Sequence, residues 1–289
     1  MSEAKPFGAT QAILGEGALW YGDRLYWIDI EGKRVYIDDV AAGTQAVLDV
    51  PERVGTVVPR AKGGLVVALA NGFAFLDERT GAVTPITDPE PNRPDNRFND
   101  GKCDPAGRFW AGTMSVKESK GAGALYMLDR KGVAHRKLDD VSVSNGICWS
   151  HDKTKMYYVD TPTQQVVTFD YDDASGEIKN PRVKIAIDPA EGHPDGMTID
   201  ADGNLWIALW QGYAVVAHDP RTGKRLHKIE LPVAKVTSCA FGGLDLADLY
   251  ITSASIGLSA EERAKQPLAG SLFLARPGAR GVPAFAYAG

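Results

Sequence analysis

Six similar segments follow one another along the chain at intervals of roughly 40–50 residues. Each has a polar turn, an apolar or aromatic pair and a short run of β-type residues, as in GDRLYWIDI (Gly22–Ile30) and DGNLWIALW (Asp202–Trp210). Repeats of this length match the blades of a β-propeller. We therefore predict an all-β fold, a six-bladed β-propeller, forming a single domain over residues 1–289. The equivalent apolar anchors of the six segments are Leu25, Leu65, Phe109, Met156, Leu205 and Leu249.

Long helical periods are missing, and the one short helix expected is Ser259 to Lys265. Aspartate and glycine between the other runs are explained by tight hairpin turns, which need their backbone geometry. A β-sandwich would also show short strands, but sixfold self-similarity favours the propeller.

Composition excludes several functional classes. The net charge of -5 disfavours an electrostatic nucleic-acid binder. No apolar run reaches the roughly 20 residues that span a bilayer, and Met1 to Gln11 lacks the apolar stretch of a signal peptide. We expect a cytoplasmic protein without nucleic-acid or membrane partners, and a monomer because propellers protect their sheet edges. The three cysteines fit buried free thiols in a reducing compartment: Cys103, Cys148 and Cys239.

Equivalent positions of successive blades lie on a ring around the central channel, so a site should appear at one phase of the repeat. We expect this phase in the loop entering each innermost strand, about 9–11 residues before each anchor. Asn-Gly and Asp-Gly pairs also mark turns. Four side-chain oxygens at one phase nevertheless favour a site at one mouth of the channel. The six positions are Glu16, Gly55, Asn99, Asn145, Asp195 and Cys239.

Carboxylates brought together on such a ring repel each other unless a cation neutralises them. Oxygen ligands suit a hard divalent cation, with Ca²⁺ favoured and Mg²⁺ or Mn²⁺ as alternatives. Zn²⁺ and Fe²⁺ stay open, although Cys239 is the one Cys or His residue of the ring.

Neighbouring residues suggest how a ligand would be held. Arg97 stands two residues before Asn99, so both side chains point the same way in an extended segment. Arg97 can bind a carboxylate or hydroxyl oxygens, or stabilise an oxyanion, or form only an ion pair at the rim. His193 is a candidate for the surroundings of Asp195, or a surface residue. Trp20, Trp149 and Trp210 are candidates for the walls of the mouth.

The motifs around these positions are GEGALW, NRFNDGKCDPAGRFWAGTM, SNGICWS, PDGMTIDADGNLW and LPVAKVTSCAFGG. Over nearly the whole chain the sequence resembles the SMP-30/gluconolactonase/regucalcin family. The resemblance implies a six-bladed propeller that hydrolyses sugar lactones with one divalent metal. It places the metal ligands at Glu16, Asn145 and Asp195, and the substrate contacts at Arg97 and Asn99. A substrate-contacting glutamate of some members falls on Lys117, with Glu118 next to it.

These observations predict a metal-dependent sugar lactonase that converts an aldonolactone of the gluconolactone type, or a related pentono- or hexono-lactone, into the aldonic acid. Asp195 is the candidate general base, and water activated by the metal alone is the alternative. Two other functions are considered. One is a calcium-binding regulatory protein without important catalysis, and the other is an arylesterase or phosphotriesterase on the same propeller.

Overall fold

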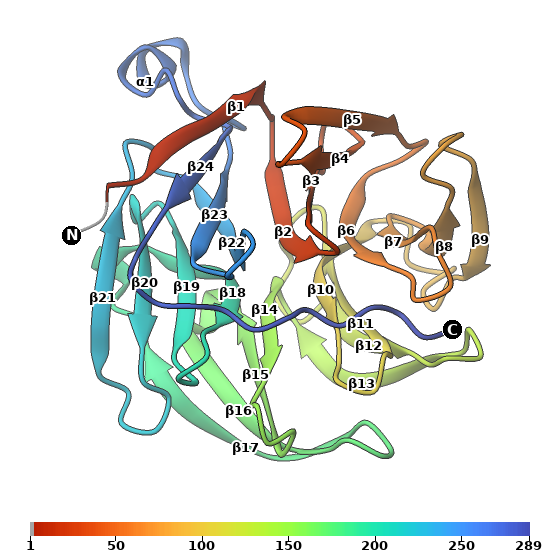
Figure 1. Cartoon of the computed structure of the whole chain (residues 1–289). Helices are drawn as coiled ribbons and strands as arrows, with labels where there is room; N and C mark the ends of the chain where they lie inside the picture. The colour runs from red at the N-terminus through yellow and green to blue at the C-terminus, as the bar shows by residue number, and fades with distance from the viewer. Residues whose placement is uncertain (1–2) are drawn as a thin grey trace.

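The structure is a computed structural model, and it describes residues 3–289. Its 24 strands form six four-stranded antiparallel sheets around a central channel (Figure 1). This confirms the prediction of a six-bladed β-propeller. The first two residues of the predicted range 1–289 lie outside the described residues.

The first three blades run from the innermost to the outermost strand in chain order. Blade 1 consists of β2 (Gly15–Tyr21), β3 (Arg24–Asp29), β4 (Arg34–Asp39) and β5 (Thr44–Asp49). Blade 2 consists of β6 (Val54–Pro59), β7 (Leu65–Leu69), β8 (Gly72–Leu76) and β9 (Val83–Thr87). Blade 3 consists of β10 (Asn96–Cys103), β11 (Phe109–Ser115), β12 (Gly123–Leu128) and β13 (Ala134–Val141).

The next two blades repeat this order, and the last blade takes its fourth strand from the amino-terminal end of the chain. Blade 4 consists of β14 (Ser144–Trp149), β15 (Lys155–Asp160), β16 (Gln165–Asp172) and β17 (Glu177–Ala186). Blade 5 consists of β18 (His193–Ile199), β19 (Leu205–Trp210), β20 (Ala214–His218) and β21 (Arg225–Glu230). Blade 6 consists of β22 (Val236–Gly242), β23 (Asp248–Ser253), β24 (Ser271–Ala275) and β1 (Lys5–Gln11).

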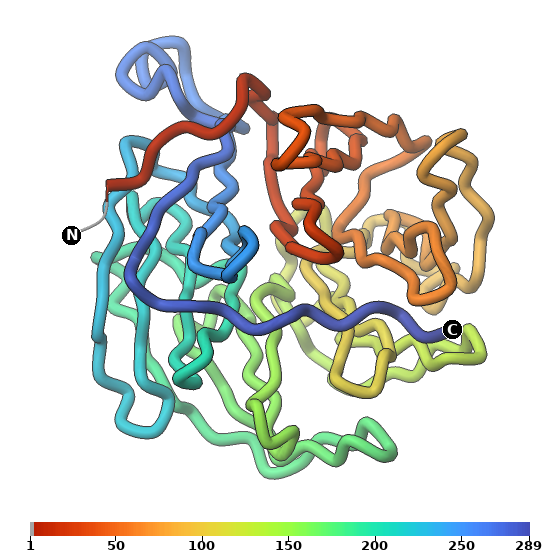
Figure 2. Tube along the Cα trace, viewed as in Figure 1, coloured from red at the N-terminus to blue at the C-terminus, as the bar shows by residue number. Residues whose placement is uncertain are grey.

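Blade 6 closes the ring, because β1 pairs antiparallel with β24 as the outermost strand. In Figure 2 the red segment that holds β1 runs beside the blue segment that holds β24. The pairing leaves no gap between the first blade and the last, so each blade is flanked by two others.

Neighbouring blades pack through aromatic and aliphatic side chains. Phe73 of blade 2 lies 4.6 Å from Phe98 of blade 3, measured between ring centroids, and Trp206 of blade 5 lies 5.4 Å from Phe241 of blade 6. Nearly all residues of the innermost strands are buried, whereas those of an outer strand such as β5 are mostly exposed. The rigid wall of the channel is therefore made by the innermost strands.

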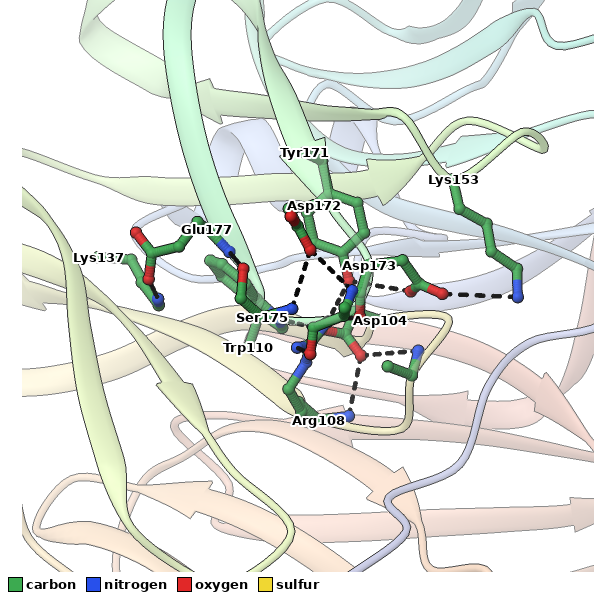
Figure 3. Close-up of polar contacts among 12 residues, drawn as sticks. Asp104, Arg108, Trp110, Lys137, Lys153, Tyr171, Asp172, Asp173, Ser175 and Glu177 are labelled. Carbon is green, nitrogen blue, oxygen red and sulfur yellow. Dashed lines mark hydrogen bonds and ion pairs between the residues drawn. The ribbon is translucent and has the colours of Figure 1, made fainter.

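A buried aspartate holds the tryptophan of the repeat in several blades. Trp110 Nε1 donates to Asp104 at 2.8 Å, and Trp206 Nε1 donates to Asp200 at the same distance. In blade 3 Arg108 also pairs with Asp104 at 2.6 Å and donates to the Tyr171 hydroxyl of blade 4 (Figure 3). Trp110 and Trp206 are fully buried, so they belong to the core of their blades.

Every innermost strand has an irregularity near its start, where its register with the second strand of the blade shifts. In β18, for example, Pro194 pairs with Leu209 and the next pair is Met197 with Ile207. Such β-bulges turn side chains out of the regular alternation of a strand. A bulge therefore occurs in all six blades, near the positions that the repeat pattern predicted for the site.

The residues after β24 cross one face of the ring (Figures 1 and 2), and we call residues 276–289 the C-terminal strap. The strap is tied to blade 6 by Gly281 N donating to Leu246 O, and to blade 2 by Tyr287 N donating to Pro59 O. It covers the end of the channel where the innermost strands finish.

The predicted short helix is present as α1 (Ala260–Lys265), and its Ser259 side chain and Glu262 form a capping box. There are also two 3₁₀ turns. The first, η1 (Thr161–Thr163), precedes β16 of blade 4, and the second, η2 (Pro189–Glu191), precedes β18 of blade 5. Within residues 3–289, no helix has the length and apolar character needed to cross a membrane.

Candidate functional site

A cavity of about 580 Å³ opens at the end of the channel where the innermost strands begin. Its walls include the five residues predicted as metal ligands or substrate contacts: Glu16, Arg97, Asn99, Asn145 and Asp195. They come from four different blades and belong to β2, β10, β14 and β18. The expectation that they stand in the loops entering these strands is wrong, since they lie within the strands, at the bulges.

The sixth position of the ring also needs correction. Val236 pairs with Ser253 as Pro194 pairs with Leu209, and both partners lie four residues after their anchors. The residue equivalent to Asp195 is therefore Thr237 and not Cys239. Cys239 lies deeper, and its thiol faces the Trp206 carbonyl oxygen at 3.5 Å. Counting back from an anchor failed here because the spacing differs from blade to blade.

The centre of the cavity floor is a pair of buried carboxyl groups. Glu16 is 5% exposed and Asp195 is 4% exposed, and the two side chains are close enough to share a hydrogen bond. Burial, reinforced by the charge of Asp100, raises the pKa of Glu16 to about 8. Burial and the neighbouring Glu16 raise the pKa of Asp195 well above its usual range. Without a cation, this pair holds a proton at neutral pH.

Asp100 is a third carboxylate near this pair, and it was missed in the sequence. It is buried at 4% exposure next to the bulge of β10, and its Oδ2 atom has no hydrogen-bond partner among the described residues. The signal was present in the run Asn99-Asp100-Gly101, because a bulge lets two adjacent side chains face the same side.

A chain of hydrogen bonds fixes the amide groups beside the carboxylates. Arg97 Nη1 donates to Asn99 Oδ1 at 2.7 Å, and Asn99 Nδ2 donates to Asn145 Oδ1 at 3.1 Å. Asn145 Nδ2 donates to Thr161 Oγ1 at 2.8 Å, and this hydroxyl donates to Pro194 O at 2.8 Å. The chain links blades 3, 4 and 5, and it leaves a lone pair on Asn145 Oδ1. Thr161 had no motif that could have identified it.

The oxygen atoms around the floor of the cavity suit a hard divalent cation as ligands. Glu16, Asp195 and Asn145 supply side-chain oxygens, and Asp195 Oδ1 is buried without a hydrogen-bond partner. A cation there would satisfy that atom and remove the repulsion between the carboxylates. Among residues 3–289 no group of three or more His, Cys, Asp and Glu side chains is arranged to hold a metal. The third protein ligand would therefore be the amide of Asn145.

The rim of the cavity carries charged groups that the sequence did not reveal. Arg53 pairs with Glu31 at 2.9 Å across blades 1 and 2. The ammonium of Lys235 lies 5.0 Å from the ring centroid of Trp210 and donates to Ile256 O. These side chains come from segments far apart in the sequence, so no local motif joins them.

The structure separates Lys117 from Glu118. Lys117 is exposed and pairs with Asp95 at 2.9 Å, outside the cavity lining. Glu118 adopts φ 53° and lines the cavity. A turned backbone thus brings a carboxylate to this wall although the aligned position carries a lysine.

The remaining candidates divide between the two ends of the channel. His193 and Trp210 line the cavity with Asp195. Trp20 and Trp149 do not, because they stand at the far ends of β2 and β14 and line a second cavity there. Their assignment to the mouth is wrong, since strand direction places them at the opposite end.

The structure defines the class of this protein as a closed six-bladed β-propeller with an oxygen-lined, partly charged cavity at one mouth of its channel. The family described as "SMP-30/Gluconolactonase/LRE-like region" matches residues 14–255. The chain belongs to this family.

Curated relatives match over nearly the full length. The chain is 40% identical over 282 residues to a putative sugar lactone lactonase YvrE of Bacillus subtilis (strain 168), covering 97% of each protein. It is 42% identical over 281 residues to regucalcin of Danio rerio, covering 96% of this chain and 95% of that protein. The similarity therefore extends over nearly the whole propeller.

Solved structures show the same architecture. A luciferin-regenerating enzyme superposes with a TM-score of 0.93 at 29% identity, covering 100% of both chains. A calcium-binding protein, regucalcin, from Agrobacterium tumefaciens superposes with a TM-score of 0.92 at 30% identity, covering 96% of this chain and 95% of that one.

Proposed function

We propose that this protein is a metal-dependent hydrolase of sugar lactones, which opens an aldonolactone to the aldonic acid. The observation that carries the proposal is the buried pair of Glu16 and Asp195, with an unpartnered carboxylate oxygen beside Asn145 in an open cavity. A relative named as a lactonase at 40% identity supports the choice of reaction.

Glu16, Asn145 and Asp195 would hold one divalent ion, with Ca²⁺ favoured because all three donors are oxygens. The Agrobacterium relative is described as calcium-binding, which supports this choice. When bound, the ion supplies Lewis-acid polarisation of the ester group and lowers the pKa of water.

Arg97 and Asn99 would bind the hydroxyl groups of the sugar. Arg97 uses Nη1 for Asn99 Oδ1 and Phe98 O, which leaves its other N–H groups for substrate. Asn99 already donates both amide hydrogens, to Ser144 O and Asn145 Oδ1, so it would meet a substrate hydroxyl as an acceptor through Oδ1. This preset geometry positions the lactone without reorganisation.

Asp195 is the proposed general base. It would take a proton from water as the water oxygen bonds to the lactone carbonyl carbon, and return the proton to the ring oxygen as the C–O bond breaks. The sum is one water added and one ester bond cleaved. Arg97 would oppose the negative charge that grows on the carbonyl oxygen.

The walls favour a polyhydroxylated substrate. Eleven of the nineteen lining residues are charged or polar. An aryl ester would present few partners to Arg97, Asn99 and Glu118, whereas each hydroxyl of an aldonolactone can pair with one of them. We therefore favour sugar lactones over aryl esters and phosphotriesters.

The deciding experiment is pH-stat hydrolysis by chelator-stripped protein, with Ca²⁺, Mg²⁺, Mn²⁺, Fe²⁺ and Zn²⁺ restored singly. The panel contains glucono-δ-lactone, pentono- and hexono-lactones, and an aryl ester, with spontaneous opening subtracted. We expect metal-restored hydrolysis of the sugar lactones, and its loss in Asp195→Asn. A folded protein that binds Ca²⁺ tightly but hydrolyses no lactone with any metal would overturn the proposal in favour of an ion-binding regulator.

A further inference from the structure

A second cavity, of about 310 Å³, lies at the other end of the channel beneath the C-terminal strap. Trp20, Trp149 and Phe241 on its walls stand near the ends of three innermost strands, and residues 282–285 of the strap cover it. It shares no lining residue with the first cavity. Asn145 and Trp149 belong to the same strand, so the two cavities are separated by about 13 Å along it.

The walls of this second cavity are mostly apolar and contain no acidic side chain. The large side chains are buried, with Trp20 at 8%, Trp149 at 5% and Phe241 at 4% exposure. Trp20 stacks on Tyr250 with an interplanar angle of 4°, which holds this wall in place. No aspartate or glutamate is among the lining residues, whereas Lys102, Lys153 and His151 are.

The two lysines differ in their surroundings. Lys153 is exposed at the rim, and its ammonium is 3.7 Å from Asp173 (Figure 3). Lys102 extends from blade 3 across the channel and donates to Met197 O of blade 5. Within residues 3–289 no carboxylate lies within 4.0 Å of the Lys102 ammonium. Lys102 is partly buried, and the buried Asp100 interacts with its charge without forming an ion pair. No carboxylate faces this ammonium from the lining of the second cavity, so an anionic ligand there would give it a direct partner.

A second hydrogen-bond donor belongs to another lining residue of this cavity. The indole Nε1 of Trp149 is buried and has no hydrogen-bond partner among the described residues. The lining therefore combines apolar surface with one unpartnered indole N–H and one ammonium that has no ion pair, and it contains no carboxylate. A cation would meet no counter-charge here, and a sugar would meet few acceptors.

We propose that this cavity is a second ligand site, which binds a small monocarboxylate with an apolar body. The carboxylate would pair with the Lys102 ammonium, and the apolar body would pack between Trp20, Trp149 and Phe241. A volume near 300 Å³ is at the lower end of ligand pockets, so a single ring or a short alkyl chain fits.

The strap provides a route of entry. It is anchored by Gly281 N to Leu246 O on one side and by Tyr287 N to Pro59 O on the other. Between these anchors, residues 282–286 make no backbone–backbone hydrogen bonds within the described chain. This span can move aside without breaking a strand ladder.

The test is calorimetric titration of the full chain, in excess chelator, with sodium phenylacetate and sodium hexanoate as probes and phenylacetamide as the neutral counterpart. We expect one saturable site for a carboxylate and at least tenfold weaker binding of the amide. Lys102→Met should weaken carboxylate binding at least tenfold. The matched variant Lys153→Met removes the same charge at the rim, and it should change binding less than about twofold because Lys153 is exposed and already paired.

The inference would be overturned by no binding of either carboxylate, by equal binding of phenylacetamide, or by equal effects of Lys102→Met and Lys153→Met. Displacement of phenylacetate by D-gluconate would also overturn it, because the probe would then occupy the first cavity. Lactone hydrolysis is not measured in this test, so its outcome is independent of the proposed function.

Discussion

At the scale of single residues, the conflict between Glu16 and Asp195 is the feature that most directly links structure to function. Two buried carboxyl groups in contact are unfavourable in the charged state, and the fold holds them together in spite of this. A site that binds a cation needs such an arrangement, since the free energy released on neutralising the pair contributes to the affinity of the site for the ion.

This conflict predicts how the stability of the metal-free protein depends on pH. The pKa of Glu16 is about 8 in the folded chain, against 4.5 for a free side chain. The folded state therefore holds this proton more tightly, and its stabilising effect is complete below pH 4.5 and is lost as the pH rises through 8. In EDTA, the melting temperature should fall between pH 6 and pH 9 more steeply than that of Glu16→Gln.

Thermal unfolding of the two proteins at each pH measures this difference, and their common titrating groups cancel in the comparison. Parallel pH profiles would contradict the prediction. In wild-type protein the affinity for Ca²⁺ should rise with pH over the same range, because the proton must leave before the cation binds.

A second residue-scale prediction concerns the wall formed by Glu118. Glu118→Gln removes the charge at the cavity and should raise KM for sugar lactones, with kcat changed less than about threefold, because the side chain would contact hydroxyl groups and not the reacting atoms. Lys117→Met is the matched control: its ion pair with Asp95 is exposed and outside the lining, so the kinetics should stay unchanged. Steady-state kinetics on purified variants decide this. An effect of Lys117→Met as large as that of Glu118→Gln would disprove the assignment.

The sequence predicted four of the polar residues of the cavity because they share a phase of the repeat, and it predicted Arg97 because it stands two residues before Asn99 in an extended segment. It missed Asp100, Thr161 and Lys235, which belong to other phases or come from loops. Their convergence depends on side-chain directions and on the curvature of the ring, and neither is visible in a linear pattern.

At the scale of the secondary-structure elements, the β-bulge of each innermost strand is what aims the site residues. The strands themselves could be predicted from alternation and turn residues. The bulges could not be predicted in this way. In a bulge two residues of one strand lie opposite a single residue of its partner, which is a property of the pairing between strands. This is also why Thr237 was overlooked in favour of Cys239.

Gly146 provides a test of the bulge in β14. A Cβ atom at this position would lie 2.6 Å from Met197 Cβ and 2.7 Å from Asp195 O, so Gly146→Ala must displace the bulge of β18. We expect at least tenfold weaker metal binding and a lower melting temperature. Gly8→Ala on the outermost strand is the control. A φ of 70° strains an alanine at this position, but no atom lies within 4 Å of the added carbon. It should destabilise the fold by about 1 kcal/mol and leave metal affinity intact. Calcium titration of both variants measures the contrast, and equal affinities would refute the role given to the bulge.

At the scale of the whole molecule, the ring is a closed circle of six blades whose last blade depends on both ends of the chain. The number of blades followed from the repeats. The pairing of β1 with β24 did not, because Lys5 and Leu274 are partners that no local pattern connects.

Deleting residues 1–11 should leave blade 6 with three strands and expose the edge of β24, whose sequence SLFLA is largely apolar. An exposed apolar edge pairs with other chains, so we expect a lower melting temperature and self-association. Size-exclusion chromatography with light scattering measures the association. A deletion variant that stays monodisperse and melts like the full chain would show that β1 is dispensable.

The closing strand also determines when the ring can form during synthesis. β1 leaves the ribosome first, but its partner β24 lies near the other end of the chain. At about 5–20 residues per second, translation separates the two by on the order of 15–50 s. For that interval the nascent chain carries an unpaired strand while five complete blades can already assemble. The pairing that closes the ring is therefore among the last contacts to form.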